Sequence, residues 1–76
     1  MTRNDFENLL DTQCDVMFSC EGKHYTVCIT VEGYDIAEQI TCANRRVFKS
    51  VAALLDNYDI GDGCLADKIE QIVIEN

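Results

Sequence analysis

The feature that most constrains the fold is a strict alternation of apolar and polar residues on both sides of Glu21-Gly22. The apolar positions are, in chain order, Cys14, Val16, Phe18 and Cys20, then Tyr25, Val27, Ile29 and Val31. Successive side chains of a strand point to opposite faces, so each run has one apolar face. Two such runs joined by a tight turn containing glycine predict a β-hairpin over residues 14–31. Pairing Phe18 with either Tyr25 or Val27 keeps the apolar sets together, which leaves the register open.

A short helix is predicted ahead of the hairpin, over residues 2–12. Its apolar stripe at helical spacing consists of Phe6, Leu9 and Leu10. Thr2 or Asn4 suits the N-cap, because a short polar side chain accepts a hydrogen bond from the free amides of the first turn. We expect this helix to end near Thr12.

The centre of the chain carries a weaker alternation. After a turn at Glu32-Gly33, it predicts a third strand from Tyr34 to Cys42. Glu38 falls among the apolar positions of that strand, and an inward carboxylate indicates an edge strand or a bulge. We expect residues 43–49 to form a polar connector.

The C-terminal third predicts two short helices. Ser50 suits the N-cap of a helix over residues 51–58, and the glycines of residues 59–63 predict a turn. Apolar residues at helical spacing then predict a helix that starts near Cys64. Residues 72–74 fit either the end of that helix or a fourth strand.

These elements together predict an α+β fold. We expect a two-layer sandwich in which an antiparallel sheet of three or four strands carries helices on one face. A chain of 76 residues, without proline and without repeats, favours a single domain over residues 1–76.

The net charge is −8, from 14 acidic and 6 basic residues. Binding nucleic acid through its phosphates requires clustered Lys and Arg, so the composition argues against that mode. Apolar runs stay well short of the roughly 18 residues of a membrane span, and the first residues do not resemble a signal peptide. We therefore expect a cytoplasmic domain without membrane contact, and the carboxylate excess favours a basic protein partner.

The chain contains five cysteines, Cys14, Cys20, Cys28, Cys42 and Cys64. Their spacing includes no C-x-x-C pair, which zinc and redox motifs use. Cysteines of a cytoplasmic chain are expected to be reduced and buried in the core, so we expect no metal and no cofactor. The alternative is a metal or small-ligand sensor that combines His24 with some of the cysteines.

Catalysis has little support in the sequence. Nucleophilic catalysis needs a nucleophile within hydrogen-bond reach of a base. His24 and Cys28 share the polar face of the predicted hairpin, but residues i and i+4 of a strand are about 13 Å apart. The acidic segment 56–67 does not fit a calcium loop, because Tyr58 and Ile60 occupy positions that need oxygen ligands. We therefore expect no enzyme activity.

The candidate binding site consists of Arg45, Arg46, Lys49 and Ser50. The three cations make up half of the basic residues of the chain and directly precede the Ser50 helix. The amides and the dipole of a helix N-terminus favour anions, and arginine adds paired donors. The site would bind an anion or a protein partner, whereas the ordinary interpretation is a solvated loop.

One segment carries a family resemblance. The residues concerned are Phe48, Lys49, Ser50, Val51, Leu54, Leu55, Asp56, Asn57, Ile60, Gly63 and Leu65. This pattern, over roughly residues 48–74, resembles the C-terminal part of small, functionally unassigned α+β proteins of Gram-positive gut bacteria. In those proteins an aromatic-x-Ser opens a helix that ends in Leu-Leu-x-Asn. The match departs at Gly61 and Cys64, and it implies a fold without implying an activity.

The functional hypothesis is a small acidic protein-interaction module, an adaptor or an immunity-type inhibitor, that binds a basic partner without catalysis. DNA mimicry by carboxylates is a related version. The alternatives are the metal or small-ligand sensor and the anion site at Ser50. A monomer or a homodimer is compatible with the sequence, since an edge strand near residues 36–42 is able to pair with its symmetry mate.

Overall fold

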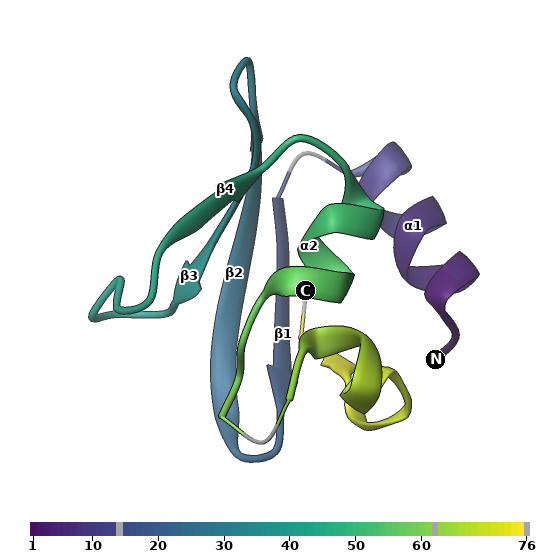
Figure 1. The fold of residues 1–76 in the computed structure, drawn as a ribbon, viewed down its shortest axis with the longest axis vertical. Helices are drawn as coiled ribbons and strands as arrows, with labels where there is room; N and C mark the ends of the chain where they lie inside the picture. Colours follow the sequence, from purple (N-terminus) through teal and green to yellow (C-terminus); the bar gives the residue numbers. More distant parts are fainter. Residues whose placement is uncertain (14, 62, 76) are drawn as a thin grey trace.

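The computed structural model describes residues 1–13, 15–61 and 63–75. In these residues the elements are α1 (Arg3–Thr12), β1 (Asp15–Cys20), β2 (Lys23–Thr30), β3 (Gly33–Glu38), β4 (Arg46–Phe48), α2 (Val51–Asn57), the 3-10 helix η1 (Leu65–Gln71) and β5 (Val73–Ile74). The five strands form one antiparallel sheet in the order β4-β3-β2-β1-β5 (Figure 1). The fold is α+β as predicted, with more strands than the three or four expected.

The β1–β2 hairpin is confirmed, and it uses the register with Phe18 opposite Tyr25. Glu21 and Gly22 form its turn with φ of 51° and 82°, the left-handed pair that matches the twist of the flanking strands. The apolar side of β2 is buried only as far as Val27. Ile29 and Val31, expected on the apolar face, are exposed because the β2–β3 end of the sheet projects beyond the helices (Figure 1). Cys14 lies outside the described residues.

Strand β3 ends at Glu38, and the predicted extension to Cys42 is wrong. Ile40 and Cys42 have φ of 69° and 57°, a left-handed conformation that ends strand pairing. The chain then turns back and places Ile36 opposite Arg46 in β4.

Strand β4 corrects two further predictions. Residues 43–49 are not simply a connector, because Arg46–Phe48 pair with β3. A run of three residues is too short for alternation to show in the sequence. Strand β3 is therefore an inner strand over Tyr34–Ile36, and of the edge expected near residues 36–42 only Ile36 pairs with β4.

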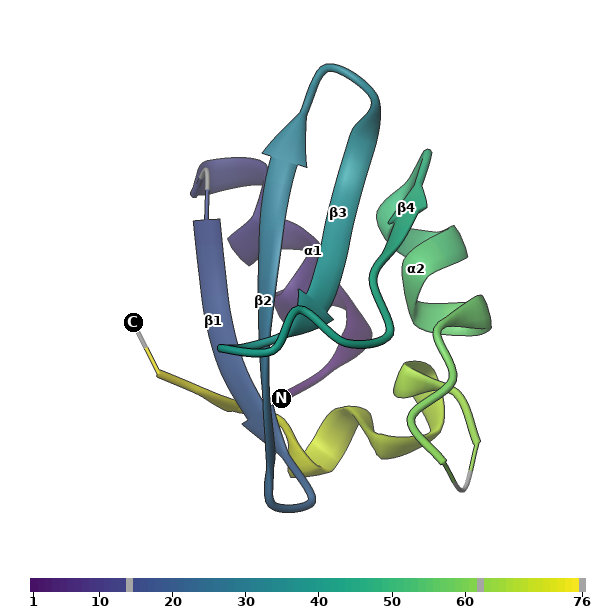
Figure 2. The same ribbon diagram turned by 90° about the vertical axis from the view of Figure 1, so that its left-hand side faces the viewer.

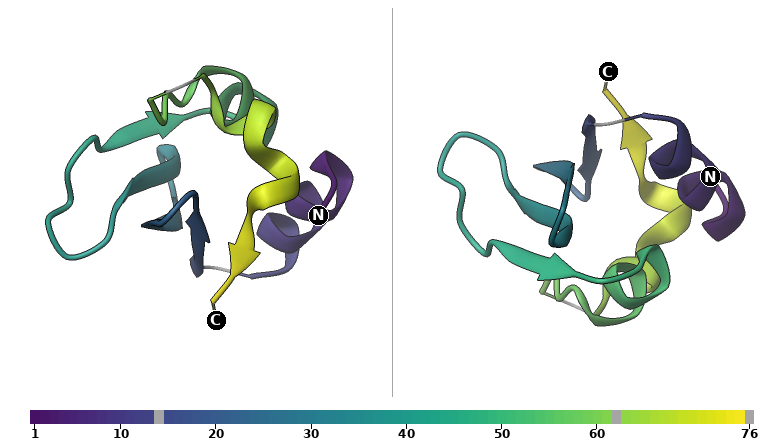
Figure 3. Two further views of the ribbon diagram at one scale, coloured as in Figure 1. Left: turned by 90° about the horizontal axis from the view of Figure 1, so that it is seen from below. Right: turned by 90° about the horizontal axis from the view of Figure 1, so that it is seen from above.

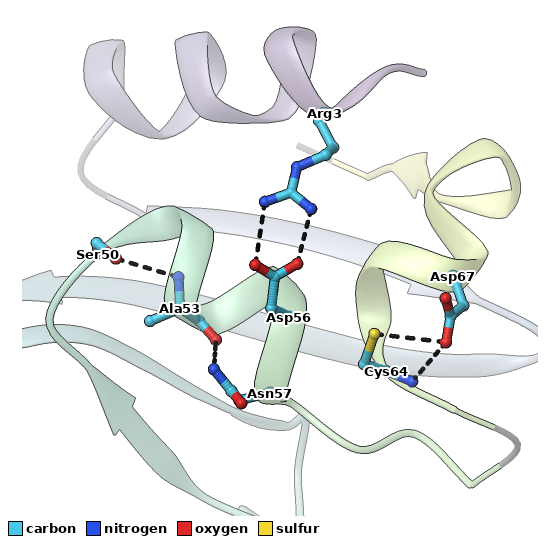
Figure 4. Close-up of polar contacts among 7 residues, drawn as sticks. All are labelled: Arg3, Ser50, Ala53, Asp56, Asn57, Cys64 and Asp67. Carbon is cyan, nitrogen blue, oxygen red and sulfur yellow. Dashed lines mark hydrogen bonds and ion pairs between the residues drawn. The ribbon is translucent and has the colours of Figure 1, made fainter.

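Two of the three predicted helices begin at predicted caps: α1 at Thr2, one of the two candidates, and α2 at Ser50. Thr2 and Asp5 form a capping box at the start of α1, and the Ser50 hydroxyl accepts a hydrogen bond of 3.1 Å from the amide of Ala53. The helix expected near Cys64 is η1, where Asp67 Oδ2 accepts hydrogen bonds from the Cys64 amide and thiol (Figure 4). Both caps satisfy amides that a helix start would otherwise leave without a partner.

The last residues form a strand. In β5, Val73 and Ile74 pair with Ser19 and Phe18 of β1, which decides the alternative left open for residues 72–74. The sheet curls, and α1, α2 and η1 lie on its inner side (Figure 3). An ion pair of 2.7 Å between Arg3 and Asp56 joins α1 to α2 (Figure 4).

Five aromatic side chains form a continuous row through the core. Phe18 makes an edge contact with Phe6 of α1 and stacks on Tyr25 of β2, with ring centroids 5.6 Å and 5.3 Å away. Tyr58, which follows α2, makes edge contacts with Tyr25 and with Phe48 of β4 at 5.9 Å and 6.3 Å. The row therefore joins both helices to three strands. Contacts of this kind each contribute about 0.5–1.5 kcal/mol beyond the area that they bury.

Gly33 and Gly22 provide a matched pair for testing the β3–β4 contact. Both have positive φ, but a Cβ at Gly33 would overlap the backbone oxygen of Phe48, whereas a Cβ at Gly22 would meet open space. We expect Gly33→Ala to lower the free energy of unfolding by about 2–3 kcal/mol, and Gly22→Ala by about 1 kcal/mol. Urea denaturation measures both, and equal losses would contradict the close approach of β4.

Candidate functional site

The structure does not bring the four predicted site residues together. Arg45 Nη2 and Nε donate hydrogen bonds of 2.7 Å and 3.0 Å to Asp35 Oδ2, on the side of the sheet away from the helices. Arg46 lies over the ring of Phe48, 4.7 Å from its centroid, and Nη1 donates to the backbone oxygen of Asn57 at 3.3 Å. The two arginines are thus held on different partners.

The other two predicted residues have local roles. Lys49 Nζ donates a hydrogen bond of 3.0 Å to the backbone oxygen of Glu32, in the β2–β3 turn. Ser50 caps α2, a helix of seven residues. Since each cation has its own partner, the geometry does not converge on one anion.

The thiols are spread through the structure. Cys20 is buried in the core and its thiol donates to the backbone oxygen of Lys68 at 3.8 Å. Cys42, by contrast, is exposed, while Cys28 and Cys64 are half-buried, so the prediction of core thiols holds for Cys20 alone of these four. Residues 1–13, 15–61 and 63–75 contain no cluster of three or more His, Cys, Asp or Glu side chains able to hold a metal.

The main surface feature is the side of the sheet that faces away from the helices, here called the outer face. The strand register places on it Asp15, Met17, Ser19, His24, Thr26, Cys28, Asp35, Ala37, Val47 and Val73. The β3–β4 loop, residues 39–45, crosses in front of this face (Figure 2). Two adjoining hollows, both open to solvent, lie between the loop and the outer face.

The first hollow has a volume of about 420 Å³ and the second about 530 Å³. Thr26, Cys28 and Ala37 line the first from the sheet, and Cys42 and Arg45 line it from the loop. The second lies beside the hairpin turn and the end of the chain, against Lys23, His24 and Glu75. Glu38, Gln39 and Ile40 line both, so the start of the loop separates the hollows.

Gln39, the first residue of the loop, is hydrogen-bonded to the sheet. Its amide donates to the backbone oxygen of His24 at 3.0 Å, and its side-chain Nε2 donates to the backbone oxygen of Tyr25 at 3.0 Å. The same Nε2 donates to Glu75 Oε1 at 3.1 Å, while Glu75 Oε2 lies 2.8 Å from His24 Nδ1. These bonds fix where the loop leaves β3.

The end of the loop is pinned by Asn44. Its side chain donates to the backbone oxygen of Asp59 at 3.1 Å, and its backbone oxygen accepts a bond of 3.0 Å from the hydroxyl of Tyr58. Tyr58 is fully buried, and this burial raises the pKa of its hydroxyl to about 12. The loop is therefore anchored to the aromatic row.

Ile40 combines full exposure with an unusual backbone. Its side chain is 100% exposed, and its φ of 69° lies in the left-handed region. A β-branched residue in that region is a genuine outlier that costs stability. The alternation placed Ile40 inside a strand, so the sequence carried no signal of this position: residue 40 is neither Gly nor Asn, the usual left-handed residues.

The chain matches no protein-family model, no curated protein and no solved structure. The resemblance over residues 48–74 therefore stays a prediction. No helix among the described residues has the length and apolar character to cross a membrane.

Tyr58 predicts a change of stability at alkaline pH. Because its pKa rises from 10.0 in the unfolded chain to about 12 in the fold, the neutral hydroxyl stabilises the protein fully below pH 10, and this contribution disappears between pH 10 and 12. We expect Tyr58→Phe to cost about 1 kcal/mol near neutral pH, from the lost hydrogen bond. In urea denaturation, the difference in free energy of unfolding between the two proteins should shrink above pH 10 and change sign near pH 12, because two pKa units correspond to about 2–3 kcal/mol. Tyr25 also has a pKa raised by burial and interacts electrostatically with Tyr58, so both proteins carry Tyr25→Phe. A constant gap would contradict this account.

Ile40 predicts a substitution that raises stability. Asn tolerates the left-handed conformation, so Ile40→Asn should increase the free energy of unfolding by about 1 kcal/mol. Val31 is the control, because it is 106% exposed and lacks a positive φ. Thermal or urea denaturation should show Val31→Asn within about 0.5 kcal/mol of the parent protein. A loss of stability in Ile40→Asn would show that Ile40 is not strained.

Proposed function

We propose that the chain is a small cytoplasmic protein-interaction module, an adaptor or an immunity-type inhibitor, that binds a basic partner through its outer face and does not act as an enzyme. The observation that carries the proposal is Ile40, a fully exposed apolar side chain held in a strained conformation between two hollows. Strain of this kind persists where the surroundings impose it, and it concentrates at sites of function.

Binding supplies a reason for the exposed position of Ile40. An apolar anchor beside a hollow is typical of the few residues that carry most of the affinity of an interface. Met17 and Val73, on β1 and β5 of the outer face, are also exposed. A partner that covers the loop and this face would bury apolar surface that the fold leaves in water.

Charge favours a basic partner. Ion pairs join Arg3, Arg45 and Lys68 to acidic residues. These pairs use three of the 6 basic residues but only three of the 14 acidic residues. Asp15 and Asp35 belong to the outer face, and Glu75 lines its second hollow. Asp35, Glu38 and Glu75 line the hollows beside Ile40. Carboxylates around an apolar anchor favour a partner that presents an apolar residue flanked by Lys or Arg.

The sensor alternative has less support. The described residues contain no metal-ligating cluster, and His24 pairs with Glu75 rather than with a thiol. DNA mimicry requires a regular ladder of carboxylates, whereas the carboxylates of the outer face are separated by apolar residues and by Arg45.

The test is an NMR titration with a short peptide of alternating Lys and Leu, matched by a peptide of alternating Glu and Leu. We expect the Lys peptide to shift amides of β2, β3 and residues 39–45, with an affinity that falls as salt rises. Ile40→Asn should weaken binding about tenfold, which corresponds to about 1.4 kcal/mol, and Val31→Asn should leave it unchanged. Shifts confined to the helices, equal binding of the Glu peptide, or no binding would overturn the proposal.

A further inference from the structure

Two thiols line the first hollow from opposite sides. Cys28 comes from β2 of the outer face, and Cys42 comes from the β3–β4 loop that lies over it. Both are free thiols. Cys20 and Cys64 do not line this hollow: Cys20 lies in the core, and the Cys64 thiol donates to Asp67 at the start of η1. The fold therefore pairs two cysteines that are fourteen positions apart in the sequence.

Arg45 lines the same hollow as the two thiols. Its guanidinium binds Asp35, which lies directly opposite Cys28 in the β2–β3 register. The same guanidinium interacts electrostatically with Cys42, and Cys28 interacts with Asp35. The cation and the exposed thiol thus line the same hollow, which has a volume of about 420 Å³.

The two thiols differ in reactivity. Burial raises the pKa of Cys28, and a hydrogen bond with Asp15 raises it further, so both disfavour the thiolate form of Cys28. Cys42 is exposed beside Arg45. A small disulfide must reach the attacking sulfur, so the exposed Cys42 reacts before the half-buried Cys28.

We propose that Cys42 is an S-thiolation site for small disulfides such as oxidised glutathione, and that Cys28 is its resolving thiol. The Cys42 thiolate attacks one sulfur of the small disulfide, which forms a mixed disulfide and releases one small thiolate. Cys28 then loses its proton to solvent and attacks Cys42 Sγ, which forms the Cys28–Cys42 bridge and releases the second small thiolate. Two protein thiols are oxidised, and one small disulfide is reduced to two thiols.

The bridge would change the shape of the outer face. A disulfide holds its two Cα atoms within about 7 Å, so the bridge would tie the β3–β4 loop to β2 across the first hollow. If the outer face binds a partner as proposed above, oxidation would block that binding. This consequence rests on the proposed function, whereas the thiol chemistry is independent of it.

In the experiment, the reduced protein is treated with one equivalent of oxidised glutathione. The protein carries Cys14→Ser, which leaves Cys20, Cys28, Cys42 and Cys64. Cleavage after Glu, Lys and Arg places Cys28, Cys42 and Cys64 in separate peptides for mass spectrometry. We expect the adduct on Cys42 first, followed by its replacement with a Cys28–Cys42 bridge. In Cys28→Ser, the adduct on Cys42 should persist. Equal labelling of Cys64, or a Cys28→Ser variant that loses its adduct like the parent, would overturn the proposal.

A matched pair of arginine variants tests the role of the neighbouring cation. Arg45→Gln should slow modification of Cys42 by anionic oxidised glutathione at least threefold, because the guanidinium attracts the carboxylates of the reagent. It should not slow modification by cationic cystamine. Arg46→Gln is the control, since Arg46 lies over Phe48 and does not line the hollow. Equal rates in both variants would overturn the assignment of Arg45. Binding of the Lys–Leu peptide is measured separately, before and after oxidation. The proposed thiol chemistry and the proposed binding function can therefore each be refuted without the other.

Discussion

The structure depends on the row of five aromatic rings that crosses its core. A chain of 76 residues has little apolar surface to bury, so large rings in direct contact supply a large share of the packing. Phe18 lies near the centre of the sheet and contacts both α1 and β2. Tyr58 continues the row to β4 and, through its hydroxyl, holds the end of the β3–β4 loop. The same residues therefore hold the core together and position the candidate site.

The candidate site is built on the side of the sheet that the core does not use. The inner side faces the helices, so the outer face is free to carry polar residues, thiols and the loop (Figure 2). Gln39 and Asn44 pin the loop at both ends, and Ile40 between them is held in a strained conformation. Such a rigid frame suits a binding surface. Because the exposed side chain is already held in place, little further conformational entropy is lost when a partner binds.

The sequence predicted the elements whose signals are local. Alternation found the β1–β2 hairpin, and the caps at Thr2 and Ser50 placed the starts of α1 and α2. Alternation missed β4, which has three residues. It also extended β3 through Ile40, because an apolar residue at an alternating position predicts a strand and carries no signal of a left-handed backbone. The predicted anion site rested likewise on residues that are close in the sequence. In the fold, Arg45 binds Asp35, Arg46 lies over Phe48 and Lys49 bonds the backbone of Glu32, so neighbours in the sequence have separate partners.

What the sequence determined by itself is the α+β composition, the hairpin and the helix starts, since each follows from periodicity or from a side chain that bonds its own backbone. Only the tertiary structure decided the order of the sheet, the pairing of Arg46–Phe48 with β3, and the outer face with its two hollows. It also decided that Cys28 and Cys42 line one hollow. These features come from contacts between distant segments, which depend on how the aromatic core packs and which no local pattern of residues encodes.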